Sequence, residues 1–415
     1  MNLITILNRC HRLPGFVYRK TRFSNDGRQI EVTVEPRKGA KMICSGCQQP
    51  APGYDRLPQR RFEFIPLWGF LVFLLYTMRR VNCPRCGVKV EQVPWADGKH
   101  HLTKTYMVFL ARWARRLSWK QAAEVFHTSW DKVRDSVEYV VSFGLKHRQL
   151  DSIRAIGVDE ILYAKGHKYL TLVYQIDHGM TRLLWVGKER SIEAFTGFFT
   201  MLGPDRTAKI EFVCSDMWKA YLTVIRKHCS QALHILDRFH IVAHMNKALD
   251  EIRAGEARRM ASDGFEPVLK KSRWCLLKRP TNLTAKQKLR LRDLLAYNLR
   301  TVRAYLLKEQ FQHFWNYSSP FWAGQFLDGW CTLVMRSRLE PMKKVARMLR
   351  SHRHLLLNYF KAQKLFSSGV VEGLNNKAKV TMRRSYGFRS FPVLELALYH
   401  SLGNLPEPKL THEFF

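Results

Sequence analysis

The chain has 415 residues, of which 46% are hydrophobic, and 69 Lys and Arg against 34 Asp and Glu give it a net charge of +35. A chain of this length and apolar content is expected to fold throughout, into two to four domains. Basic residues are spread over the whole length, which predicts an extended contact with a polyanion. Nucleic acid is the default partner, and an anionic membrane surface or ribosomal RNA is the alternative.

Two features argue against a membrane-spanning or secreted protein. The longest apolar run, residues 64–78, is interrupted by Pro66 and Gly69, and this pattern indicates strands and not a transmembrane helix. The N-terminus lacks the charged start and long apolar core of a signal peptide. We therefore expect an intracellular protein with reduced thiols and no disulfides.

Four of the nine cysteines form two Cys-x-x-Cys pairs, Cys44 with Cys47 and Cys83 with Cys86. Each pair places two thiolates on one tight turn, at the spacing that tetrahedral zinc requires, and two pairs complete a closed structural site. The alternative is four unrelated buried thiols. We predict a zinc-binding domain over residues 1–98, in which structural Zn²⁺ stabilises a small fold.

Residues 99–150 are predicted to form a helix-turn-helix domain. Apolar residues recur at helical spacing from 103 to 141 and fit three short helices, with Thr128 or Ser129 as the cap of a helix that begins at Trp130. Lys132 and Arg134 would lie exposed on this candidate recognition helix and contact DNA. The alternative is a three-helix unit that only packs.

From residue 151 the pattern changes from helical to strand-like. Strands are predicted over 154–161, 169–176 and 183–186, then a helix over 192–202, a strand over 210–214, a helix over 218–227 and a strand over 232–236. Three strands joined by hairpins and followed by alternating helix and strand are the order of the ribonuclease H-like fold. This first part of the core is assigned to residues 151–243.

Two acids in this core are candidate metal ligands. Asp159 lies on the first strand, on the face of Gly157, while the alternation of side chains sends Glu160 to the other face. Asp216 lies just past the end of a strand, where ligands collect in parallel sheets. As alternatives, Asp216 could be a helix cap and Asp159 a strand-end acid paired with arginine.

The remainder of the chain is predicted to be helical. Residues 244–364 form an all-helical insertion whose tryptophans belong to its core, with one alternative that a tryptophan stacks on an unpaired base. Residues 365–415 supply the closing helices of the core. A helix over 369–384 carries Glu372 in its first turn, where the helix dipole favours a carboxylate, and Asn376, Lys379 and Arg383 share its face.

Several motifs together resemble the ISL3 family of bacterial insertion-sequence transposases, and the resemblance covers nearly the whole chain. They are Gly157-Val-Asp159-Glu160, Lys165-Gly-His-Lys-Tyr169, Ser215-Asp216-Met-Trp-Lys-Ala-Tyr221, Asp237-Arg-Phe-His240, Ser272-Arg-Trp-Cys-Leu-Leu277 and Val371-Glu-Gly-Leu-Asn-Asn-Lys377, with the two cysteine pairs. The resemblance implies a DDE transposase of multidomain α/β fold, in which a ribonuclease H-like mixed-sheet core is interrupted by an all-helical insertion and preceded by zinc-binding and helix-turn-helix domains.

The resemblance also implies the chemistry. Asp159, Asp216 and Glu372 would be the three catalytic acids, and Asp237 and His240 would lie near the site. Carboxylates of this kind hold two Mg²⁺ or Mn²⁺ ions against a scissile phosphate. The expected substrates are transposon ends and target DNA, and no small molecule or membrane. We expect further DNA contacts from Lys168, Lys219 and Lys377, and a homodimer on paired ends in the bacterial cytoplasm, associated with the nucleoid.

Two other classes of function remain at this stage. A DNA-binding regulator with zinc and a helix-turn-helix would explain the charge and the first part of the chain, but it leaves the acids and the long C-terminal part without purpose. A nuclease of the ribonuclease H type would use the same acids without strand transfer.

Overall fold

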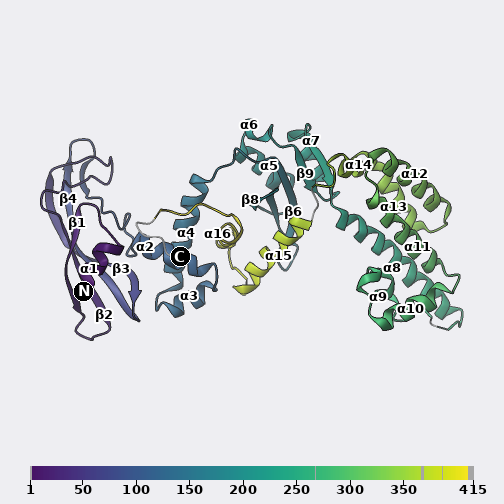
Figure 1. The fold of residues 1–415 in the computed structure, drawn as a ribbon, viewed down its shortest axis with the longest axis horizontal. Coiled ribbons are helices and arrows are strands. Elements are labelled where there is room, and N and C mark those ends of the chain that lie inside the picture. The colour runs from purple at the N-terminus through teal and green to yellow at the C-terminus, as the bar shows by residue number, and fades with distance from the viewer. Residues whose placement is uncertain (1, 267, 366–368, 386, 410–415) are drawn as a thin grey trace. The chain divides into compact units, whose positions relative to one another are not determined.

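The computed structural model describes residues 2–266, 268–365, 369–385 and 387–409. The chain divides into two compact units (Figure 1). One unit comprises residues 1–149 and 377–415, so it is built from both ends of the chain, and the other comprises residues 150–376. Within the described residues, no helix is both long and apolar enough to cross a bilayer.

The first unit begins with a five-stranded mixed sheet. Strand β4 is its centre: β4 pairs in parallel with β2 and antiparallel with β3 and β5, and β1 pairs with β2. The apolar run at 64–78 contributes the end of β3 and most of β4, as predicted. The helix and strands of this N-terminal part are α1 Leu3–Cys10, β1 Phe16–Phe23, β2 Gln29–Pro36, β3 Gly53–Leu67, β4 Phe70–Cys83 and β5 Gly87–Val90.

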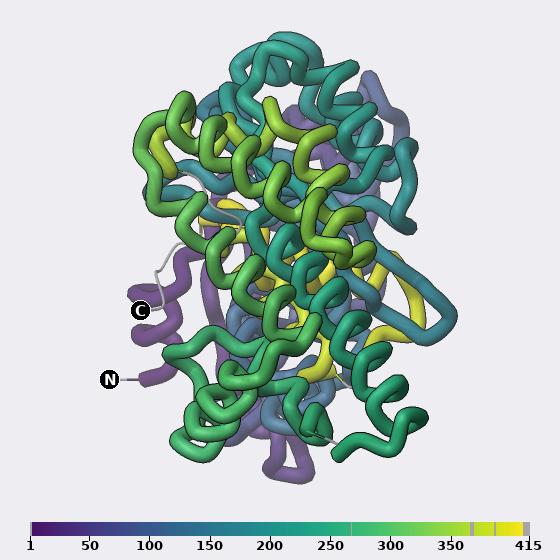
Figure 2. Tube along the Cα trace, turned by 90° about the vertical axis from the view of Figure 1, so that its right-hand side faces the viewer, coloured from purple at the N-terminus to yellow at the C-terminus, as the bar shows by residue number. Residues whose placement is uncertain are grey.

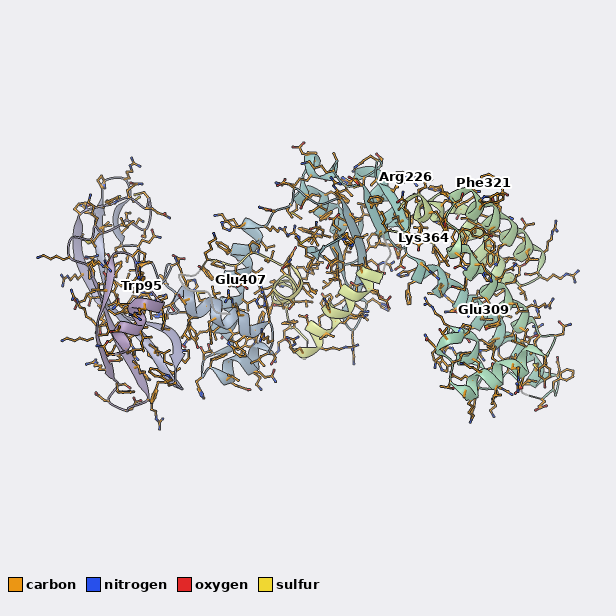
Figure 3. All side chains as sticks on the ribbon, viewed as in Figure 1. Trp95, Arg226, Glu309, Phe321, Lys364 and Glu407 are labelled. Atoms are coloured by element: carbon orange, nitrogen blue, oxygen red, sulfur yellow. The ribbon has the colours of Figure 1, made fainter. Side chains whose placement is uncertain are left out.

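Aromatic side chains fill the core beside this sheet. Trp95, which is labelled in Figure 3, is buried and makes edge contacts with Phe16, Phe62 and Tyr76 at centroid distances of 4.9, 5.9 and 5.3 Å. Edge contacts of this type add to the stabilisation from burial alone. The sheet therefore has a core of its own in addition to the cysteine cluster at its edge.

Three helices follow, as predicted: α2 Lys104–Ala114, α3 Trp119–Val125 and α4 Trp130–His147. Their N-caps are Thr103, Ser118 and Ser129, and each side chain accepts a backbone N–H from the first turn. The last helix of the chain, α16 Phe391–Leu402, packs against α4. Residues 365–415 had been assigned to the catalytic core, and α16 instead contacts the helical part of the first unit.

The second unit contains a mixed sheet of order β10-β9-β6-β7-β8. Strands β6, β7 and β8 are antiparallel neighbours, whereas β9 and β10 run parallel to β6. Every strand and helix predicted here is present. The elements are β6 Ala155–Ala164, β7 Lys168–Asp177, β8 Met180–Lys188, α5 Ile192–Leu202, α6 Pro204–Thr207, β9 Phe212–Ser215, α7 Lys219–His228 and β10 Leu233–Leu236.

The two faces of this sheet are covered by different parts of the chain. On one face, Ile156 and Val158 pack in a buried cluster with side chains of α5 and α7, including Phe195 and Tyr221. On the other face lies helix α15 Gly369–Arg384, whose bounds agree with the predicted helix. A Cβ at Gly157 would come within 2.3 Å of Val371 Cγ2, so glycine is required there to admit this side chain of α15.

The region between β10 and α15 is helical, as predicted. Helix α8 packs against α11 and α13, and α12 packs against α13 and α14 (Figures 1 and 2). Trp315 and Trp330 are buried in this core, but Trp274 and Trp322 are 55% and 61% exposed, so the tryptophans are divided between core and surface. The helices are α8 Arg238–Ser262, α9 Arg273–Leu277, η1 Pro280–Asn282, α10 Ala285–Leu295, α11 Arg300–Phe311, η2 Gln312–Asn316, α12 Pro320–Arg336, α13 Glu340–Ser351 and α14 Arg353–Lys361.

Candidate active site

The four predicted cysteines meet at one edge of the first sheet. The Sγ atoms of Cys44, Cys47, Cys83 and Cys86 all lie within 4.8 Å of one another. Cys83 ends β4, and Cys86 precedes Gly87, whose φ of 70° lets the chain turn into β5. The four thiols are therefore not scattered through the fold, and the alternative of four unrelated cysteines is wrong.

This sulfur cluster has the donor set and spacing that zinc requires. Four ligands at a Zn–S distance of about 2.3 Å are separated by roughly 3.8 Å from one another in a tetrahedron, and Cys47 Sγ and Cys83 Sγ are 3.5 Å apart. Backbone N–H groups of Arg85 and Cys86 lower the pKa of the Cys83 thiol to about 7, which favours the thiolate form that binds metal.

Asp159 lies in the middle of β6, just beyond the part that pairs with β9, and is held by a chain of hydrogen bonds. Asn375 Nδ2 of α15 donates to Asp159 Oδ2 at 2.6 Å, and the buried Tyr174 hydroxyl donates to Asn375 Oδ1 at 2.8 Å. The backbone N–H of Glu160 donates to the other carboxylate oxygen at 2.8 Å. Asn375 therefore fixes the orientation of Asp159, and Tyr174 fixes Asn375.

Asp216 and Asp237 follow the two parallel strands beside β6. Residues 155–157 of β6 pair in register with residues 212–214 of β9, and extending this register by two residues brings Asp159 level with Asp216. Likewise Leu236 of β10 pairs with Ser215, so Asp237 is the next residue beside Asp216. Asp159 in the middle of β6 and the aspartates that follow β9 and β10 thus form a row across adjacent parallel strands, at the carboxyl ends of β9 and β10, where ligands bind in parallel sheets.

Both later aspartates also have local structural roles. Asp216 Oδ1 accepts the backbone N–H of Trp218 at 2.9 Å, just before α7. Asp237 is the N-cap of α8 and accepts the N–H of Phe239 at 2.6 Å, and His240 Nε2 lies 3.8 Å from its other oxygen. A capping aspartate still has a second oxygen for another partner, so the capping alternative and a role as ligand are compatible.

Glu160 and Arg190 belong to the same centre, although neither was predicted as a member of it. Arg190 Nη2 lies 3.0 Å from Glu160 Oε1 and 3.4 Å from Asp216 Oδ2, so one guanidinium bridges the two acids. The side chains of Asp159 and Glu160 point to opposite faces of β6, as predicted. Asp216 nevertheless lies near both, because it is level with Asp159 and shares Arg190 with Glu160. One sequence feature could have indicated Arg190: it is the second residue after β8, and residues that follow strands of this sheet line the site.

The acids are short of compensating positive charge. The pKa of Asp159 is raised to about 6, mainly by burial and also by the charges of Asp237 and Asp216, against the lowering effect of a backbone hydrogen bond and of His240. Burial and the charge of Asp216 raise the pKa of Glu160 to about 7, although Arg190 opposes this. Carboxyl groups that are costly to ionise together at a strand edge fit a site that takes an additional cation.

Glu372 is exposed on the first turn of α15, three residues before Asn375. Among the described residues, the four cysteines form the one group of three or more His, Cys, Asp or Glu ligand atoms that lie mutually within 4.8 Å. Asp159, Asp216 and Glu372 are therefore not assembled at that spacing. The structure places Asp159, Asp216 and Asp237 on three adjacent strands, with His240 beside Asp237, and it places Glu372 on the helix that contacts Asp159.

The predicted DNA-contacting side chains differ in their surroundings. Lys168, Lys219, Lys377, Lys379 and Arg383 are exposed, and the last three lie on α15. Lys132 forms an ion pair with Glu63, and Arg134 pairs with Asp131 and Asp135. These last two positive charges are partly neutralised by neighbouring acids of the same unit.

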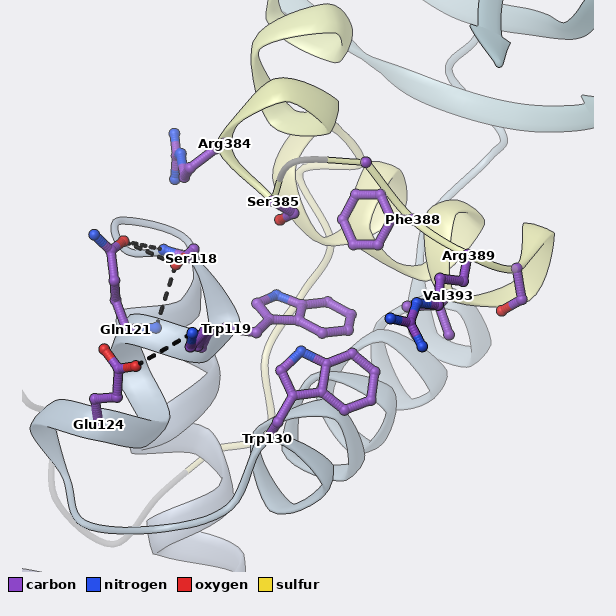
Figure 4. Close-up of a pocket in the computed structure, with 13 residues that line it drawn as sticks. Ser118, Trp119, Gln121, Glu124, Trp130, Arg384, Ser385, Phe388, Arg389 and Val393 are labelled. Atoms are coloured by element: carbon purple, nitrogen blue, oxygen red, sulfur yellow. Dashed lines mark hydrogen bonds and ion pairs between the residues drawn. The ribbon is translucent and has the colours of Figure 1, made fainter. Parts of the chain in front are cut away.

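A hollow of about 910 Å³ in the first unit offers a different kind of surface. Trp119, Trp130 and Phe388 line it, with ring centroids 5.7 Å apart for the two tryptophans and 5.8 Å apart for Trp119 and Phe388 (Figure 4). Arg384 and Arg389 stand at its side. Aromatic rings flanked by cations are the chemistry that stacks bases and neutralises phosphates.

Comparison with known proteins decides the class of this molecule. The family model for ISL3-type DDE transposases, described as a transposase, matches residues 156–398, which is more than half of the chain. The chain belongs to this family. The matched range includes Asp159, Asp216, Asp237 and Glu372, and it begins after the cysteine cluster.

Individual transposases resemble the chain over most of its length. It is 31% identical to the transposase for insertion sequence element IS1557 of Mycobacterium tuberculosis, over 92% of this chain and 91% of that protein. It is 27% identical to the transposase for insertion sequence element IS1001 of Bordetella parapertussis, over 90% of this chain and 92% of that protein. This ISL3 transposase is therefore an enzyme of a class that transfers phosphoryl groups of DNA.

Proposed function

We propose that this transposase binds the inverted-repeat ends of an insertion sequence and catalyses divalent-metal-dependent cleavage and strand transfer into target DNA. The observation that carries this proposal is the row of aspartates across adjacent parallel strands, with Asp159 of β6 level with Asp216, which follows β9. The strand order, with three antiparallel strands followed by two parallel ones, supports a ribonuclease H-like core.

Asp159 and Asp216 would hold the metal, and Glu372 would complete the site. Two Mg²⁺ or Mn²⁺ ions bound by such carboxylates activate an attacking hydroxyl and stabilise the leaving oxygen of a phosphodiester. The residues fit this group, because their donors are hard oxygens and because Asp159, whose pKa is raised, is partly buried beside the buried Asp216.

The exposed position of Glu372 supports the proposal that the site is completed only when DNA binds. Asn375, one turn further along α15, is already bonded to Asp159. Glu372 lies on the same helix but is exposed, so a change in its side chain or in the first turn of α15 would bring it to the acids. We propose that DNA and metal together recruit Glu372, while Asp237 and His240 assist beside Asp216.

The first unit is the proposed reader of the transposon ends. Zinc at the four cysteines would stabilise the N-terminal sheet, and α4 or the hollow lined by Trp119 and Trp130 would contact DNA. The lysines and arginines along α15 would contact phosphates. A homodimer on paired ends would supply two active sites.

The deciding experiment supplies the purified chain with a linear fragment that bears the inverted repeats flanking its gene, Mg²⁺ and a supercoiled target. Integration of the fragment, with a direct repeat at the junction, is the expected result. Cutting without joining would instead support a nuclease, and binding without cutting would support a regulator. A fragment with scrambled ends is the matched control.

A further inference from the structure

The acidic centre of this transposase contains a cation of its own, the Arg190 guanidinium. Its Nη2 bridges Glu160 and Asp216, whose side chains are 14% and 8% exposed, and the arginine itself is 31% exposed. A charge-assisted contact at this degree of burial is stronger than a surface ion pair. Arg190 therefore neutralises Asp216 in the absence of metal.

Arg190 is held in place from several sides. Its Cζ lies 4.3 Å from the ring centroid of Trp218, a distance at which a cation and an indole attract each other. The preceding residue, Glu189, has a φ of 73°, which a non-glycine residue rarely adopts, and its backbone bonds to Tyr169 and Thr171 of β7 fix the turn.

The bridge is incomplete in a way that suggests exchange. Within the described residues, the buried Nε of Arg190 and the buried Oε2 of Glu160 have no hydrogen-bond partner. The contact to Asp216, at 3.4 Å, is also longer than the contact to Glu160, at 3.0 Å. An arginine placed only for stability would be expected to satisfy these groups by a two-pronged contact with one carboxylate.

We propose that Arg190 occupies the Asp216 carboxylate in the metal-free enzyme and is exchanged there for a divalent metal ion, while Glu160 and Trp218 retain it. This inference rests on the proposed function, since it takes Asp216 as a metal ligand. It assigns Glu160 the task of holding Arg190 and not of binding metal. The arginine and the metal compete for one carboxylate, so the contact of Arg190 with Asp216 weakens metal binding and bound metal weakens that contact.

The two partners of the exchange give opposite predictions for metal affinity. Arg190→Gln removes the competitor, and Mn²⁺ binding to the DNA-free full chain should tighten by on the order of tenfold. Glu160→Gln removes the group that draws Arg190 away from Asp216, and Mn²⁺ binding should weaken. In the double variant, affinity should stay within about twofold of Arg190→Gln, because Glu160 acts through the arginine.

Isothermal titration calorimetry with Mn²⁺ at pH 8 measures these affinities without DNA or turnover. Lys219→Gln removes one positive charge from the first turn of α7 and is the charge-matched control, with a smaller expected change. Arg190→Lys, which keeps a charge but loses the planar fork, should tighten binding less than Arg190→Gln and serves if the latter fails to fold.

The outcomes separate this inference from the function on which it rests. If wild-type protein binds Mn²⁺ and Asp159→Asn does not, but Arg190→Gln binds no more tightly than wild type, the exchange is wrong and the metal site stands. If Glu160→Gln weakens binding equally with and without Arg190, Glu160 is itself a ligand and the exchange is again wrong. If wild-type protein binds no Mn²⁺, the proposed metal site fails together with the exchange.

Discussion

The cysteine cluster and the acidic centre differ in how far the fold alone assembles them. Four thiols from two turns of one sheet edge already lie within 4.8 Å of one another. The acids come from β6, from the ends of β9 and β10 and from α15, and Glu372 remains exposed. A structural site is closed by its ligands, whereas a catalytic site must leave positions for its substrate. The following predictions test this difference, beginning with the largest expected effect.

Asp159→Asn should lower strand cleavage by on the order of 10³-fold or more, because a neutral amide cannot replace a metal-binding carboxylate. Glu372→Gln should lower cleavage to a similar degree. The two variants should differ in Mn²⁺ binding without DNA, which only Asp159→Asn should weaken strongly. Cleavage of labelled transposon ends and calorimetry with Mn²⁺ make the comparison. Equal loss of Mn²⁺ affinity in both would show that Glu372 already belongs to the metal-free site.

Cys83→Ser should abolish zinc binding and lower the melting temperature of the N-terminal sheet, since structural zinc contributes folding free energy in addition to the aromatic core around Trp95. Zinc content by atomic emission and thermal unfolding in circular dichroism measure both effects. Cys10→Ser is the matched control, because Cys10 is exposed and lies outside the cluster. Full zinc content and unchanged unfolding in Cys83→Ser would rule out the cluster as a zinc site.

Asn375→Leu should reduce cleavage by about 10- to 100-fold, the usual effect of losing a group that orients a metal ligand. Tyr174→Phe should have a smaller effect, since it removes one neutral hydrogen bond worth about 1 kcal/mol. Initial rates of cleavage at saturating Mg²⁺ rank the two variants. If Tyr174→Phe reduced cleavage more than Asn375→Leu, Tyr174 would not act on Asp159 through Asn375, and the proposed chain of hydrogen bonds would be wrong.

Mg²⁺ should raise the melting temperature by a few degrees at pH 8 and by less at pH 5.5. The pKa values of Asp159 and Glu160 are raised to about 6 and 7, so protons bind the folded state more tightly than the unfolded state. Their contribution to stability is present at low pH and is lost as pH rises through 6 to 7. Bound metal replaces the proton of Asp159, whereas Glu160 pairs with Arg190. Scanning calorimetry at both pH values, with EDTA as control, tests this, and a larger Mg²⁺ effect at pH 5.5 would contradict it.

Most of the secondary structure of the core was predictable because strand alternation, turns and helix periods are local signals. The register that aligns Asp159 with Asp216 follows from strand pairing, and the cysteine cluster follows from its spacing. Arg190 and Asn375 were not predicted as members of the site. Their roles depend on which side chains meet between β8, β6 and α15, and such contacts between distant segments leave no periodic pattern in sequence. The packing of α16 on α4 was missed for the same reason.

Helix α15 limits how related transposases can exchange whole units, because it runs through both of them. Its first eight residues, 369–376, group with the catalytic unit, and the remainder groups with the unit built from the chain termini. If the first unit reads the transposon ends, as proposed, a chimera that borrows end recognition from another transposase has to replace residues 1–149 and 377–415 together, with one junction inside a continuous helix. Grafts that join the donor's part of α15 at a different helical phase would rotate that part relative to Asn375 by about 100° per residue of offset.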